Sequence, residues 1–171
     1  MNEELRSILL GTAGLSVAGA IALFLTLSRG WVDERRARIS GAVPIAFVAI
    51  LFQAAHFTEE LATSFHQRFP VLLGLTPWSL RFFVTFNLVW LAIWCLSAWG
   101  LVARCRAALF PLWFLAIGSI ANGVVHPLFA ILTGGYFPGL VTSPFVGVVG
   151  VFLIRRLLLV TDSGNPWLGS A

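Results

Sequence analysis

The chain has 171 residues, of which 58% are hydrophobic and only 11% are charged. A water-soluble domain carries roughly 25% charged residues, so this composition, with a mean hydropathy of +0.92, excludes an ordinary soluble protein. The formal net charge of +4 does not indicate nucleic-acid binding, because the basic residues are all arginine and lie mainly between apolar segments. The length favours a single domain, residues 1–171.

Five apolar stretches are long enough, or nearly so, to cross about 30 Å of hydrocarbon as helices. In chain order, we predict spans at about 7–28, 41–62, 80–103, 107–133 and 139–160. The N-terminus begins Met-Asn-Glu-Glu-Leu-Arg rather than with a basic stretch, so we interpret the first segment as a retained span and not as a signal peptide. The expected fold is an all-α, polytopic membrane bundle of about five transmembrane helices.

The arginines are distributed unevenly between the two ends of the predicted spans. One end carries Arg29, Arg35, Arg36, Arg38, Arg104, Arg106, Arg155 and Arg156, and the other carries Arg6, Arg68 and Arg81. Because short cytoplasmic segments are enriched in arginine and lysine, this pattern predicts a multi-pass protein of the cell inner membrane. Its N-terminus would lie outside and its C-terminus in the cytoplasm.

The second predicted span ends in a stripe of polar residues. At about 100° per residue on a helix, His56, Glu59 and Glu60 fall within an arc of roughly 100°. Gln53 lies one turn earlier, close to the same face. Ionisable groups at membrane depth are costly, so they mark functional sites by default.

The fourth predicted span carries Asn122 and His126 on one face. Spans two and four run in the same direction, so both polar groups fall at the same end of the bundle, toward the outer leaflet. We therefore expect one shared site.

Three ordered motifs extend across this region: His56-Phe57-Thr58-Glu59-Glu60, then Asn122-x-x-x-His126, then Tyr136-Phe137-Pro138-Gly139-x-x-Thr142. Their order, their spacing and the chain length resemble the HXXEE family of small bacterial integral membrane proteins. The resemblance implies which residues form a shared site. It supplies no substrate or reaction, because the family has no assigned function.

Two imidazoles and a carboxylate suit a divalent metal, zinc foremost, since catalytic zinc commonly has three His or Glu ligands and an open position. His56, Glu60 and His126 are the candidate ligands, although the sequence leaves open whether Glu59 or Glu60 binds the ion. Glu59 would then be the general base on the metal-bound water. Asn122 would hydrogen-bond a ligand or a substrate oxygen.

Further residues extend the candidate site. Tyr136 would donate to a developing oxyanion, and Gln53 and Thr142 would lie close to the ligands or the substrate. Arg81 either contacts a lipid headgroup or pairs with one of the glutamates. We interpret His66, in the outer loop, as a solvated interfacial residue.

Three functions compete at this point. The first is a membrane-embedded, metal-dependent hydrolase acting on a lipid or amphiphile from the outer leaflet. The second is a small proton-coupled transporter, since intramembrane Glu and His also relay protons. The third is an accessory membrane subunit in which the polar cluster locks helices together. All three predict contact with membrane lipids and none with nucleic acid, and the oligomeric state stays open.

Overall fold

The computed structural model describes residues 2–31 and 41–162, and it confirms the all-α bundle. Four helices are long and apolar enough to span a membrane: α4 (Ala42–Ala62), α6 (Leu80–Val102), α7 (Leu109–Leu132) with the preceding 3-10 turn η1 (Arg106–Ala108), and α8 (Ser143–Val160). Their bounds lie within a few residues of the predicted spans. These helices indicate a membrane protein.

The first predicted span is broken rather than continuous. It consists of α1 (Glu3–Gly11) and α2 (Ala13–Ser28), which meet at a bend of 48°. Trp78 holds α1 in this position: its indole nitrogen donates to Ser7 Oγ (3.1 Å), and its ring lies where a side chain on Gly11 would be. The predicted first span, at about 7–28, is therefore divided between two helices, because a distant tryptophan packs against the break.

The connections at the α5 end of the bundle also differ from the prediction. The segment after α4 contains a short helix, α5 (Phe65–Leu72), which sequence reasoning left as loop. The last span begins at Ser143 rather than at 139. Residues 139–142 form a turn instead, in which Gly139 takes the left-handed φ of 86°.

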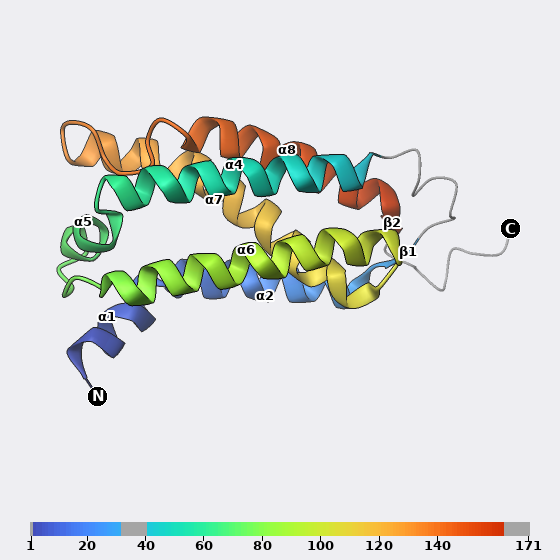
Figure 1. The fold of residues 1–171 in the computed structure, drawn as a ribbon, viewed down its shortest axis with the longest axis horizontal. Coiled ribbons are helices and arrows are strands. Elements are labelled where there is room, and N and C mark those ends of the chain that lie inside the picture. The colour runs from blue at the N-terminus through green and yellow to red at the C-terminus, as the bar shows by residue number, and fades with distance from the viewer. Residues whose placement is uncertain (1, 32–40, 163–171) are drawn as a thin grey trace, which may run out of the picture.

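Helix α7 is the centre of the bundle. Figure 1 shows it crossing obliquely between α4 and α8 on one side and α2 and α6 on the other, and it packs against α2, α6 and α8. Its Leu109, Leu112 and Trp113 are fully buried. Contact with α8 is close because both helices carry glycine there: a Cβ on Gly123 would lie 2.7 Å from Gly147 Cα. Small residues at such crossings let membrane helices approach backbone to backbone.

The opposite end of the bundle is closed by a small ribbon, in which β1 (Gly30–Trp31) pairs antiparallel with β2 (Thr161–Asp162). Arg29 reinforces it by donating to the hydroxyl of Thr161 (2.9 Å) and to its carbonyl oxygen (2.8 Å). Arg35, Arg36 and Arg38, which contribute to the predicted orientation, lie outside the described residues.

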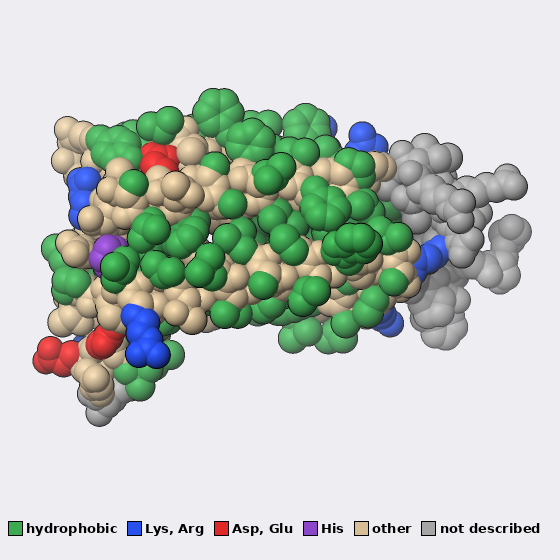
Figure 2. Space-filling model, in the orientation of Figure 1, with side chains coloured by type: hydrophobic (Ala, Val, Ile, Leu, Met, Phe, Trp, Pro, Cys, Tyr) green, Lys and Arg blue, Asp and Glu red, His purple; other side chains and the backbone are tan. Residues whose placement is uncertain are grey.

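The surface of the bundle is divided between apolar sides and charged ends. In Figure 2 hydrophobic side chains cover most of the long face, whereas most of the arginine, acidic and histidine side chains in view lie toward the two ends. Leu51, Leu96 and Trp99 are each about 70% exposed. Such a wide apolar surface is expected where lipid, rather than water, surrounds the helices.

Candidate metal centre

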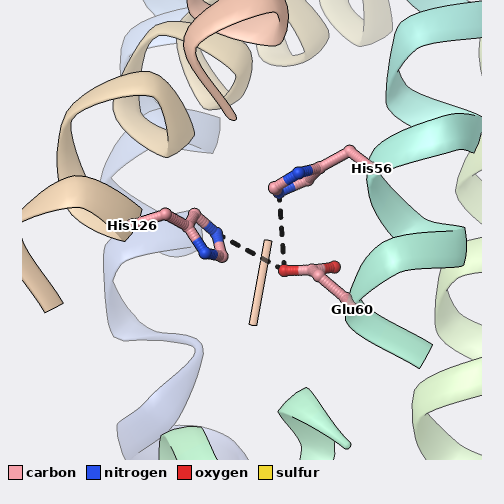
Figure 3. A group of neighbouring side chains, drawn as sticks. All are labelled: His56, Glu60 and His126. Carbon is pink, nitrogen blue, oxygen red and sulfur yellow. Dashed lines mark ion pairs between the residues drawn. The ribbon is translucent and has the colours of Figure 1, made fainter. Parts of the chain in front are cut away.

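Helices α4 and α7 bring together three of the residues singled out in the sequence. His56 and Glu60 come from one face of α4, one turn apart, and His126 faces them from α7 (Figure 3). Their side chains are almost entirely buried, at 0%, 6% and 2% exposure respectively. Among the described residues they form a group able to hold a metal ion.

The distances within this group fit metal ligands better than hydrogen bonds. Glu60 Oε1 lies 3.5 Å from His56 Nε2 and 3.4 Å from His126 Nε2. Charge-assisted N–H···O bonds are shorter, about 2.7–2.9 Å. Ligand atoms about 2.0–2.1 Å from a tetrahedral zinc ion, by contrast, lie about 3.4 Å from each other. The two distances from Glu60 Oε1 therefore match the distance between two ligand atoms of a tetrahedral metal ion.

The tautomer of His126 follows from its second ring nitrogen. Its Nδ1 lies 2.5 Å from the carbonyl oxygen of Pro138. A carbonyl oxygen only accepts hydrogen bonds, so Nδ1 must carry the hydrogen. In the neutral imidazole Nε2 then has a free lone pair, and this is the atom that faces Glu60.

The tautomer of His56 follows from a chain of two hydrogen bonds. Thr142 donates its hydroxyl to Glu59 Oε2 (2.5 Å), and His56 Nδ1 lies 2.7 Å from the same hydroxyl. Since the threonine hydrogen is used on the carboxylate, the imidazole must donate to Thr142. His56 Nε2 therefore also carries a lone pair, and it has no hydrogen-bond partner within the described chain. Histidines that bind metal are usually oriented in this way, by a partner on the other ring nitrogen.

Glu59 anchors the loop between α7 and α8. Besides the Thr142 hydroxyl, it accepts hydrogen bonds from the Tyr136 hydroxyl (2.7 Å) and from the backbone N–H groups of Val141 (3.0 Å) and Thr142 (2.8 Å). A carboxylate has about four acceptor positions, so all of them are occupied. Glu59 is placed as a positioning residue, and the arrangement does not support its expected role as a general base.

Tyr136 helps to hold the loop between α7 and α8 on Glu59. Partial burial, together with the hydrogen bond donated to Glu59, raises the pKa of this phenol above its ordinary value, which keeps it protonated and donating. Arg68 fixes the loop from the other side, since it donates to the carbonyl oxygen of Tyr136 (3.0 Å) and lies over the ring of Phe137. The predicted oxyanion role of Tyr136 is therefore not what the geometry favours.

Gly139 brings the loop backbone directly against both imidazole rings. A Cβ at this position would lie 2.5 Å from His126 Nδ1 and 2.7 Å from His56 Cε1. Pro138 and Gly139 belong to the third sequence motif, but neither has a role that the sequence predicts. Their function becomes visible only when the loop is folded over the site: one supplies a carbonyl oxygen and the other leaves room for two rings.

The remaining predicted residues divide into two groups. Gln53 and Asn122 line a cavity of about 240 Å³ that also reaches Glu60 and His126. Arg81 lies at the exposed start of α6 and lines a separate surface hollow with Ser79 and Phe82, so the structure does not bring it into the site. The prediction for His66 is wrong, because its ring is buried and stacks on Phe83, with the centroids 5.7 Å apart.

Comparison with known proteins adds no assignment: no family model, curated protein or solved structure matches this chain.

Proposed function

We propose that this chain is a membrane-embedded, metal-dependent enzyme, hydrolase-like, that acts on a lipid or amphiphile. One observation carries the proposal: two imidazole lone pairs and a carboxylate oxygen converge at 3.4–3.5 Å in a buried site. Three acceptors facing one another repel unless a cation or a proton lies between them. From the positive-inside pattern and the resemblance to HXXEE proteins, we infer that this site lies in the outer half of a bacterial inner membrane.

Zinc is the proposed ion, because a His₂Glu donor set with an open fourth position is typical of catalytic zinc. When bound, such an ion acts as a Lewis acid and lowers the pKa of water. The chain itself supplies the ligands His56, Glu60 and His126. Glu59 and Thr142 hold one imidazole in its binding tautomer. Asn122 and Gln53, which line the cavity, would orient a substrate.

A proton shared by Glu60 and one imidazole is the second candidate occupant. It is favoured by the polar side chains that continue from the site along the cavity: Gln53, Asn87, Ser119 and Asn122. These would serve a proton-coupled carrier as well as a substrate. The cavity wall beyond them is aromatic, however, at Trp94 and Phe114. A pocket closed on one side supports an enzyme better than a path across the membrane, or a cluster that only locks helices.

The test compares four preparations: the purified protein, the protein stripped with chelator, the stripped protein reloaded with zinc, and Glu60→Gln. Each is incubated with a bacterial lipid extract, and the products are identified by mass spectrometry. We expect a product that appears with the purified and zinc-reloaded protein and is absent from the other two. Equal turnover in stripped and reloaded protein would refute the metal dependence. No product in any preparation, with pH-driven flux in proteoliposomes that is lost in Glu60→Gln, would replace the enzyme with the carrier.

A further inference from the structure

The cavity at the candidate metal centre is a deep slot rather than a shallow bowl. Its wall includes His126 at one end of α7 and Phe114 far along the same helix. At 1.5 Å per residue these two positions are roughly 18 Å apart along the axis. The hydrocarbon of one leaflet is about 15 Å deep. The slot therefore reaches as far into the bundle as a lipid chain reaches into the membrane.

Aromatic side chains line both ends of the slot, Phe65, Phe69 and Phe129 at its outer end, and its polar side chains lie between them. Asn122 lies one turn further in than His126 on α7, and Gln53 and Ser119 follow about one turn beyond it; Asn87 adds an amide from α6. The deeper wall is formed by Trp90, Trp94, Phe114, Leu115 and the bare backbone of Gly118. The three large aromatic rings pack closely there, with the centroids of Trp90 and Phe114 4.5 Å apart. The polar stretch beside the metal ligands, followed by this aromatic deep wall, suits a molecule with a polar head and an apolar tail.

The slot adjoins the lipid-facing surface between α2 and α6. Both helices pack on α7 or α4 but make little contact with each other. On the α2 side no side chain covers the slot at Gly14, which is exposed and where a Cβ would meet nothing within 4 Å. On the α6 side Phe86 and Trp90 are half-buried. A molecule dissolved in the bilayer would reach the slot between these two helices.

We propose that this slot binds a single-chain amphiphile, with its tail along Trp90, Trp94 and Phe114 and its head at the His56–Glu60–His126 group. The placement of the head rests on the proposed function; the placement of the tail does not. The volume of about 240 Å³ exceeds the apolar cavity of about 150 Å³ that binds benzene, so the slot has room for part of an apolar chain.

The experiment uses palmitate that carries a diazirine at its methyl end, added to the full-length protein in detergent and activated by light. Labelled peptides are mapped by mass spectrometry. We expect labels on the deep wall near Trp94 and Phe114. Labels found only on lipid-exposed positions such as Leu96 and Trp99 would overturn the proposal.

Two glycine substitutions make a matched pair. Gly118→Phe places a phenyl ring in the slot, whereas Gly19→Phe places the same ring on α2 away from the slot. A Cβ at either position would meet nothing within 4 Å, so neither substitution creates a clash at Cβ. Deep labelling is expected to fall by about tenfold or more in Gly118→Phe, as overpacked sites lose that much affinity. It should stay at the wild-type level in Gly19→Phe. Equal deep labelling in both variants would contradict the proposal.

His126→Ala separates this proposal from the proposed function. The variant removes a metal ligand but leaves the deep wall intact, so deep labelling that is blocked by Gly118→Phe should persist in it. If the wild type binds no metal but the deep wall is still labelled, the amphiphile site is supported and the proposed metalloenzyme is refuted. If metal is bound but the deep wall is not labelled, the amphiphile site is refuted and the metal centre is supported.

Discussion

Replacing Gly139 by alanine is expected to disrupt the candidate metal centre from a residue that has no ligand atom. Two separate effects add at this position. The φ of 86° is left-handed, which costs an L-residue about 1–2 kcal/mol. The new methyl group would also lie 2.5 Å from the ring of His126 and 2.7 Å from that of His56. Both rings are rigid and held by hydrogen bonds, so relieving this overpacking costs about 1–3 kcal/mol more.

Gly134→Ala is the matched control. Gly134 has a similar φ of 69°, but a Cβ there meets nothing within 4 Å. It should therefore show only the backbone cost, about 1–2 kcal/mol, whereas Gly139→Ala should lose about 2–5 kcal/mol in total.

Two measurements in detergent test this difference: the free energy of unfolding in denaturant, and zinc affinity by competition with a chromophoric chelator. In Gly139→Ala zinc should bind at least about 10–100-fold more weakly, the usual loss when ligand orientation is disturbed. In Gly134→Ala it should be unchanged. If the two variants lose the same stability and keep the same zinc affinity, the loop backbone does not position the imidazoles.

Three further outcomes are expected. Thr142→Val removes the hydroxyl that accepts from the adjacent imidazole, so zinc affinity should fall about 10–100-fold by competition titration, while Thr142→Ser should restore it. Free zinc at one hundred times its dissociation constant should raise the unfolding free energy of the wild type by about 2.7 kcal/mol, and a similar rise in Glu60→Gln would show that the ion binds elsewhere. Gly123→Val should separate α7 from α8, since its Cβ would lie 2.7 Å from the backbone of Gly147, and lower stability by about 1–3 kcal/mol in thermal unfolding; Gly19→Val, which faces open space, should change little.

The helices could be predicted from sequence because hydropathy and length are local properties. The same is true of the pairing of His56 with Glu60, since residues one turn apart share a helix face. His126 was expected to lie near them because the second and fourth predicted spans run in the same direction. The structure brings these three side chains together as the metal hypothesis required.

The break between α1 and α2 could not be predicted in this way. It depends on Trp78, which lies far along the chain and packs against Gly11. Nothing within the first apolar stretch distinguishes a bent helix from a straight one.

The role of Glu59 was missed for a similar reason. From the sequence, Glu59 and Glu60 are neighbouring carboxylates on one helix face, either of which could bind a metal. The distinction comes from the loop between α7 and α8, whose N–H and hydroxyl groups converge on Glu59 alone. Its hydrogen-bonding partners lie more than seventy residues away, so their effect appears only in the folded chain.

The most direct test of the account is elemental analysis of three detergent-purified proteins, each stripped, reloaded with zinc and normalised to protein. They are the wild type, His126→Ala, and His66→Phe, which removes the histidine outside the ligand group while keeping an aromatic ring against Phe83. If His56, Glu60 and His126 bind the ion, zinc should be near-stoichiometric in the wild type and in His66→Phe and should be lost in His126→Ala. A wild type that binds no zinc after reloading, or equal zinc in all three proteins, would contradict this ligand set.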